Sequence, residues 1–190
     1  MKPANISLKL LIISLSLFLF FSFHVTTGAT NQIRASCDIC ARQYYDSDPN
    51  PMLNFCINSF QAARGADRAG RRELAKIAMK LLKNNVTETQ SFIKKTLKEK
   101  NLDPITKSSL NNCLGEYGFR AKASIDKGLR AYKNGQYQEA GTDMNELRFV
   151  AKSCDEGFKD NKFFYSGIAK RNDDLLLLAS LALCLLDKIS

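Results

Sequence analysis

The chain has 190 residues, a formal net charge of +9, six cysteines and one histidine, and 25% of its residues are charged. The one histidine is His24, in an apolar N-terminal stretch, so the rest of the chain contains neither histidine nor tryptophan. This composition excludes Ser-His-Asp and Cys-His nucleophile systems and histidine-based metal sites from everything that follows the N-terminal stretch.

Residues 1–29 have the pattern of a secretory signal peptide, with a basic start, an apolar run over residues 10–23 and small residues before Thr30. The apolar run is shorter than the roughly 20 residues that span a bilayer, so we expect cleavage and not membrane insertion. The secreted domain is then residues 30–190, and because the leader holds two lysines and no acid, its charge falls from +9 to +7. This charge favours acidic proteins or polyanionic polymers as partners over nucleic acid, although solubility explains it equally well.

The secreted domain is predicted to open with a helical hairpin. Residues 33–43 form the first short helix, and residues 46–50 form a loop. The second helix begins with Asn50 as its N-cap and Pro51 at the first helical position.

Three cysteines lie in this hairpin: Cys37, Cys40 and Cys56. The midpoint between Cys37 and Cys56 and the midpoint between Cys40 and Cys56 both fall in the loop. The spacing therefore leaves both disulfide pairings open. The Cys37-x-x-Cys40 motif resembles half of a metal or redox site. A second half is missing, and tetrahedral zinc needs four ligands, so we expect no metal and no cofactor here.

One long amphipathic helix is predicted from residue 68 to about residue 100, with a bend at Asn84-Asn85 as an alternative. The segment Arg64–Asp67 breaks the pattern before it, and Asp67 can cap it. Asn85-Val86-Thr87 is an N-glycosylation sequon in a chain that we expect to be exported.

The next segment is predicted to be an antiparallel pair of helices, beginning with Asp103 as a cap and Pro104 in the first turn. Apolar residues recur at helical spacing on both sides of Lys133–Gln136, a helix stop whose Asn-Gly can take left-handed backbone angles. This turn lies midway between Cys113 and Cys154. We therefore expect the two cysteines to face each other and to form a disulfide.

The C-terminal part is predicted to contain a linker over residues 155–171, with the aromatic group Phe163-Phe164-Tyr165, and then a last helix capped by Asn172. Residues 175–186 are apolar on nearly every face and too few to span a membrane, so they should form a helix buried inside the protein. No strand pattern competes, and the fold class is an all-α bundle preceded by the helical hairpin.

Three acidic residues, Glu139, Asp143 and Glu146, share one helix face. Paired carboxylates can hydrolyse glycosides, but a solvated helix face explains these residues better, since no other feature marks a cleft.

The arrangement of cysteines and their neighbours resembles the plant invertase and pectin methylesterase inhibitor family, closest to the branch that includes pollen allergens. The resemblance covers essentially the whole secreted domain. The matching segments are Ser36-Cys37, residues 54–60, residues 110–117, residues 137–140, residues 153–158 and residues 178–183.

The resemblance implies an antiparallel four-helix bundle with an N-terminal helical extension and with the disulfides Cys37–Cys56 and Cys113–Cys154. Cys40 and Cys184 then remain, either as a third disulfide or as buried free thiols. It also implies a non-catalytic, monomeric protein of the apoplast or cell wall that occludes the active site of pectin methylesterase or acid invertase in a 1:1 complex.

The expected contact surface is the helical pair over residues 103–153, including the turn Gly135, Gln136 and Tyr137. This turn stands where the invertase-directed branch has Pro-Lys-Phe. The small-residue stretch Ser-Ala-Ala of the family is replaced by Asn145-Glu146-Leu147-Arg148. The alternative function is a saposin-like protein that binds lipid through the apolar last helix.

Overall fold

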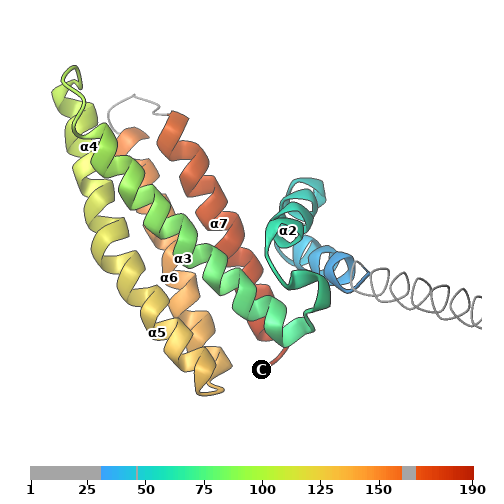
Figure 1. The fold of residues 1–190 in the computed structure, drawn as a ribbon. Coiled ribbons are helices and arrows are strands. Elements are labelled where there is room, and N and C mark those ends of the chain that lie inside the picture. The colour runs from blue at the N-terminus through green and yellow to red at the C-terminus, as the bar shows by residue number, and fades with distance from the viewer. Residues whose placement is uncertain (1–30, 46, 160–165) are drawn as a thin grey trace, which may run out of the picture.

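The structure is a computed structural model that describes residues 31–45, 47–159 and 166–190, and every regular element in those ranges is helical (Figure 1). The predicted all-α fold is therefore confirmed. The leader, residues 1–29, and the aromatic group Phe163-Phe164-Tyr165 lie outside the described ranges.

The helices follow one another as a hairpin and then a bundle. Residues 31–44 form the first helix of the hairpin. The later elements are α2 (Asn50–Ala62), η1 (Ala66–Arg68), α3 (Arg71–Thr96), α4 (Pro104–Gly115), η2 (Glu116–Ala121), α5 (Lys122–Lys133), α6 (Tyr137–Lys159) and α7 (Ser166–Asp187).

Four long rods make the bundle: α3, the continuous run α4–η2–α5, α6 and α7 (Figure 1). They lie side by side and alternate in direction. The N-terminal hairpin lies beside this bundle next to α7, to which α2 packs (Figure 1). The confirmed architecture is thus an antiparallel four-helix bundle with an N-terminal helical hairpin.

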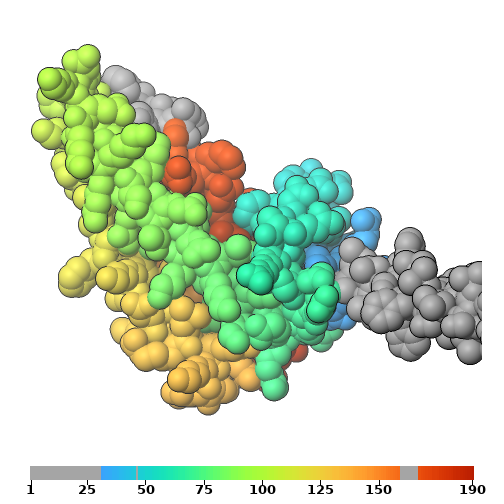
Figure 2. Space-filling view, in the orientation of Figure 1, coloured from blue at the N-terminus to red at the C-terminus, as the bar shows by residue number. Residues whose placement is uncertain are grey.

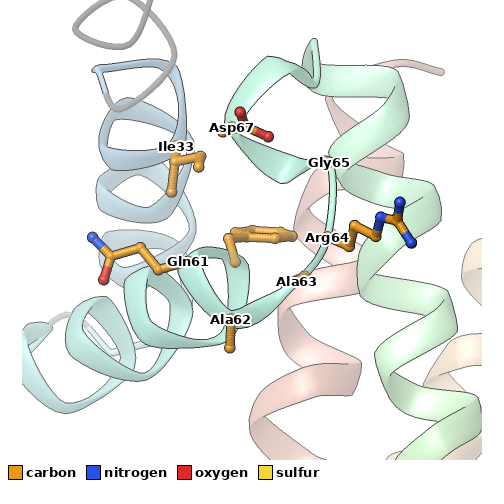
Figure 3. Close-up of a pocket in the computed structure, with 8 residues that line it drawn as sticks. Ile33, Gln61, Ala62, Ala63, Arg64, Gly65 and Asp67 are labelled. Carbon is orange, nitrogen blue, oxygen red and sulfur yellow. The ribbon is translucent and has the colours of Figure 1, made fainter.

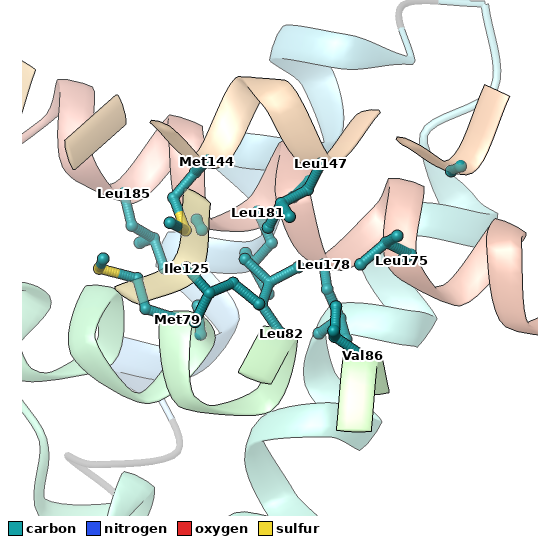
Figure 4. Close-up of a cluster of buried hydrophobic side chains, with 14 of the residues drawn as sticks. Met79, Leu82, Val86, Ile125, Met144, Leu147, Leu175, Leu178, Leu181 and Leu185 are labelled. Carbon is teal, nitrogen blue, oxygen red and sulfur yellow. The ribbon is translucent and has the colours of Figure 1, made fainter. Parts of the chain in front are cut away.

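The core lies along the axis of the bundle, where each rod presents an apolar stripe. Figure 4 shows side chains from α3, α5, α6 and α7 meeting there: Met79, Leu82, Val86, Ile125, Met144, Leu147, Leu175, Leu178, Leu181 and Leu185. The apolar helix α7 packs against α3, α6 and α2, which explains why it is hydrophobic on nearly every face. Its burial removes the surface on which the saposin-like alternative depended.

The starts of two helices test the capping predictions. Asp103 caps α4 as predicted, because its side chain accepts hydrogen bonds from the backbone N–H groups of Ile105 and Thr106 at 3.0 and 2.9 Å. The predicted cap of α2 was wrong by one residue: Pro49 is the N-cap, and Asn50 is already helical.

The long helix is shorter than predicted. α3 has 26 residues, about 39 Å at 1.5 Å per residue, and runs through Asn84-Asn85 without interruption. Gly65 interrupts the helical structure before α3 with a φ of +84°, as the sequence indicated. Asp67 does not cap α3, because it lies in η1 and the N-cap is Gly70.

The C-terminal boundaries were also predicted wrongly. Most of the expected linker, residues 155–171, is helical: α6 continues to Lys159 and α7 begins at Ser166. Asn172 therefore lies inside α7 and is fully buried instead of capping it. Of the described helices, none is both long enough and apolar enough to cross a bilayer.

Candidate partner-binding surface

Three disulfides hold the described helices together. Cys37–Cys56 closes the N-terminal hairpin with a Cα–Cα distance of 5.6 Å, and Cys113–Cys154 joins α4 to α6 at 4.8 Å. The structure pairs Cys40 with Cys184 at a Cα–Cα distance of 5.6 Å, which ties the hairpin to α7. The described residues therefore include no free cysteine.

The turn between α5 and α6 is a Schellman motif. Gly135 takes a φ of +77°, as expected of the Asn-Gly stop. The N–H of Gly135 donates to the carbonyl of Tyr132 at 3.0 Å, and the N–H of Gln136 donates to that of Ala131 at 2.9 Å. Gly135 and Gln136 are exposed, so the backbone and side chains of this turn face solvent.

Tyr137, the third residue of the predicted contact turn, is half-buried. Its ring lies 5.4 Å from that of Tyr132, and the guanidinium of Arg72 lies 5.5 Å from its centre. The hydroxyl of Tyr132 in turn donates to the backbone carbonyl of Arg72 at 2.7 Å. These contacts fix the turn against the start of α3.

A second exposed feature, which the sequence analysis missed, lies on a π-helical segment. Residues Glu116–Ala121 form η2, and π-helical turns are rare and often occur at functional sites. Tyr117 points into the core, whereas Phe119 is 86% exposed. Phe119 also falls outside the helical spacing of the apolar residues around it, which is the one sequence signal that could have identified it.

An ion pair links η2 to α6 beside Phe119. The guanidinium of Arg120 donates to the carboxylates of Glu116 and Glu146, both at 3.2 Å. Phe149 follows Glu146 by about one helical turn and is 50% exposed. We call Phe119, Arg120, Glu146 and Phe149 the aromatic patch, since each exposed ring lies within one helical turn, along its own helix, of a residue of this ion pair.

A buried polar network fixes the segment that carries this patch. The hydroxyl of Tyr117 donates to the side-chain oxygen of Asn172 at 2.6 Å, and the side-chain nitrogen of Asn172 donates to Asp155 at 2.6 Å. Gln90 of α3 donates to the backbone carbonyl of Tyr117 at 2.7 Å. Burial raises the pKa of the Tyr117 phenol, so it remains a neutral donor.

The acidic residues Glu139, Asp143 and Glu146 all lie on α6. Glu146 is held by Arg120, and burial raises the pKa of Asp143 although Lys127 and Arg130 oppose this. Within the described ranges, no group of His, Cys, Asp and Glu side chains is arranged to hold a metal ion.

The sequon residue Asn85 lies on α3 where it faces α7. Its side-chain nitrogen donates to the carbonyl of Arg171 at 3.5 Å, and the residue is half-buried. Glycosylation of Asn85 stays a prediction.

A hollow of about 430 Å³ lies between the first helix, α2 and the loop that follows α2. Figure 3 shows Ile33 and Ala63 on its walls, with the guanidinium of Arg64 directed away from Asp67. The charged groups that line this hollow therefore do not point toward one common ligand position.

The bundle is shared with solved structures. A mutant form of a pectin methylesterase inhibitor from Arabidopsis superposes with a TM-score of 0.61 at 17% identity, covering 71% of this chain and 88% of that one. A pectin methylesterase inhibitor from Arabidopsis thaliana superposes with a TM-score of 0.59 at 15% identity, covering 82% of this chain and 97% of that one. At these identities the similarity establishes a common fold.

Two curated plane-tree proteins are similar in sequence. A "Putative invertase inhibitor" of Platanus orientalis is 28% identical over 173 residues, which is 91% of this chain and 95% of that protein. One of Platanus acerifolia with the same description is 31% identical over 137 residues, 72% of this chain and 75% of that protein. Residues 31–185 match the plant invertase/pectin methylesterase inhibitor family as a whole. With its bundle, its disulfides and these relatives, the chain belongs to the plant invertase/pectin methylesterase inhibitor family.

Proposed function

We propose that this chain is a secreted inhibitor of a plant cell-wall carbohydrate-active enzyme, either pectin methylesterase or acid invertase. The observation that carries the proposal is the match of residues 31–185 to a family of non-catalytic inhibitor proteins. The inhibitor covers the active site of the target in a 1:1 complex and performs no chemistry of its own.

The proposed contact surface is the helical pair over residues 103–153, with the turn Gly135–Tyr137 and the aromatic patch. Exposed aromatic side chains and arginine are the residue types that dominate binding energy at protein interfaces. Cys113–Cys154 cross-links this pair, so its surface is ordered before the enzyme binds and loses less entropy on association.

Both enzymes belong in the proposal because the relatives' names differ. The plane-tree proteins are described as invertase inhibitors, whereas the solved structures are pectin methylesterase inhibitors. The turn Gly135–Tyr137 replaces the Pro-Lys-Phe of the invertase-directed branch, which favours testing several isoforms of both enzymes.

The proposed route is secretion to the apoplast after cleavage of the leader near Gly28 or Ala29. N-terminal sequencing of the protein recovered outside plant cells that express the full chain should begin at Ala29 or Thr30. Retention of the intact chain in a cell membrane would contradict this route.

The interface is tested with Phe119→Ala, assayed for inhibition of whichever enzyme the unaltered protein inhibits. Removal of a central aromatic anchor should weaken inhibition by about 2 kcal/mol, or roughly 30-fold. Ile39→Ala is the matched control, because Ile39 is also an exposed apolar residue but lies on the first helix. Equal inhibition by both variants would exclude the aromatic patch from the binding interface. If the unaltered protein inhibits neither enzyme, the proposed function is excluded.

A further inference from the structure

A groove of about 180 Å³ lies between α3 and α5, two rods that form one continuous face of the bundle in Figure 2. Val86 and Ile125 form its floor and are only 3% and 2% exposed. Lys83 and Lys122 are exposed and form its rim. The remaining lining groups are polar: Thr87, Gln90 and Asp126.

The antiparallel register places more lysines along this groove. The ammonium group of Lys83 lies 3.3 Å from the carboxylate of Asp126. Lys76 lies about two turns before Lys83 on α3, and Lys133 lies about two turns after Asp126 on α5. Because the two helices are antiparallel, Lys76 and Lys133 lie at the same height along the bundle. In the other direction, Lys122 lies about one turn beyond Asp126. The lysines therefore form a row of about 16 Å at 1.5 Å per residue, which includes the groove and continues beyond it.

Positive charge is in excess here. The two nearby carboxylates are already engaged, Glu73 with Lys76 at 3.5 Å and Asp126 with Lys83 at 3.3 Å. These exposed pairs contribute little to stability and can yield to a ligand. Lys80 lies about one turn from both Lys76 and Lys83 on α3. Three lysines of this row form no ion pair with any residue that the structure describes: Lys80, Lys122 and Lys133. Anions bound along this row would relieve the repulsion between like charges.

We infer that this groove, the α3–α5 basic groove, binds a polyuronate, a linear polysaccharide with one carboxylate on each sugar. The regularly spaced carboxylates match the row of ammonium groups. The C–H faces of the sugar rings match the apolar floor of Val86 and Ile125, and the ring hydroxyls match Thr87 and Gln90. A single polymer chain can reach this recessed floor, whereas the flat surface of an anionic membrane contacts only the rim.

Polyuronate binding would also link the groove to the proposed function, and this link alone depends on the proposed function. Hydrolysis of each methyl ester of pectin by pectin methylesterase consumes one water and leaves a carboxylate, methanol and a proton. The basic groove would then hold the inhibitor on polymer that the target has already processed. If the target is acid invertase, the polyuronate binding stands without this link.

The test measures binding of the secreted domain, with its disulfides intact, to polygalacturonate oligomers by isothermal titration calorimetry. The same oligomers in fully methyl-esterified form are the chemical control, because they keep the sugar rings and lose the charges. We expect binding only to the free acid, weakening steeply between about 0.05 M and about 0.5 M salt as screening increases.

The variant K80E/K122E should bind polygalacturonate about 10-fold more weakly or worse. The matched control is K152E/K170E, which changes the net charge equally at exposed sites of α6 and α7. K80A/K122A should give a smaller loss, and circular dichroism confirms that each variant is folded. Equal losses in both charge-reversed variants, equal binding of the esterified oligomers, or binding only to vesicles of anionic lipid would each overturn the inference. Enzyme inhibition is measured separately, so its failure would not affect this result.

Discussion

Tyr117 and Asn172, which lie in η2 and α7, are joined by a buried hydrogen bond of 2.6 Å between the phenol and the side-chain carbonyl. This bond connects the rod that carries the aromatic patch to the most buried helix of the bundle. Asn172 also reaches Asp155 of α6, so one amide links three of the four rods.

Tyr117→Phe tests this network. The change leaves the side-chain oxygen of Asn172 buried without its donor and should lower the free energy of unfolding by about 1–3 kcal/mol. Tyr137→Phe is the control, because its hydroxyl makes no hydrogen bond to any described residue, and it should change stability by less than about 0.5 kcal/mol. Urea unfolding with intact disulfides measures both. Equal stability of the two variants would contradict the role of the network.

Gly128 of α5 faces α6 at close range. A Cβ at this position would overlap the terminal methyl group of Met144 and lie 3.2 Å from the Cβ of Asp143. Gly128→Val should therefore destabilise the protein by about 2–3 kcal/mol through overpacking. Gly115→Val should be neutral within about 0.5 kcal/mol, because nothing lies within 4 Å of a Cβ there. A neutral Gly128→Val in thermal unfolding would contradict this packing.

The disulfide Cys40–Cys184 closes a long stretch of sequence, with a separation of 144 residues. Its removal in the double variant Cys40→Ser, Cys184→Ser should cost about 3–5 kcal/mol in the chain-entropy description. Because it is the covalent link from the hairpin to α7, hydrogen exchange should accelerate in residues 31–62 and change less in α3 and α6. Equal acceleration of hydrogen exchange throughout the chain would contradict a local stabilising effect of this disulfide on the hairpin.

Asp103 makes the start of α4 sensitive to pH. Hydrogen bonds from Thr106 and then from the backbone hold the pKa of its carboxyl below the ordinary value of 3.8. A carboxyl with a lowered folded pKa stabilises the fold above its unfolded pKa and loses this effect as the pH falls through the folded pKa.

Asp103→Asn separates the cap from its charge, since asparagine caps helices about as well as aspartate. At pH 7 the melting temperature of Asp103→Asn should lie below that of the unaltered protein by the contribution of the charge alone, and that of Asp103→Ala should lie below both. Below about pH 4, the advantage of aspartate over asparagine should disappear. Parallel pH curves for the unaltered protein and Asp103→Asn would contradict this assignment.

Much of the fold follows from sequence pattern alone. The position of the Asn134-Gly135 stop midway between Cys113 and Cys154 indicated an antiparallel helical pair, and the structure contains it. Left-handed backbone angles at Gly135 and the cap at Asp103 also follow from local chemistry. These features depend on residues close in sequence or on a simple symmetry about a turn.

The features that were missed depend on tertiary contacts. Asn172 followed by two aspartates has the pattern of a helix N-terminus, but its amide is buried between Tyr117 and Asp155 inside α7. Gly157 does not end α6, because Ser109 donates to its carbonyl at 2.8 Å and Phe158 packs in the core. Periodicity likewise predicts no π-helical turn, although it leaves Phe119 outside the apolar spacing of its neighbours.

The most direct measurement of the central claim is a titration of active enzyme with the disulfide-intact protein at enzyme concentrations well above the dissociation constant. Pectin methylesterase and acid invertase are titrated in parallel, each over several isoforms. The proposed function predicts a linear loss of activity in one of them that ends at one inhibitor per enzyme, with substrate competing against it. Unchanged activity of every isoform at several equivalents of protein would contradict it.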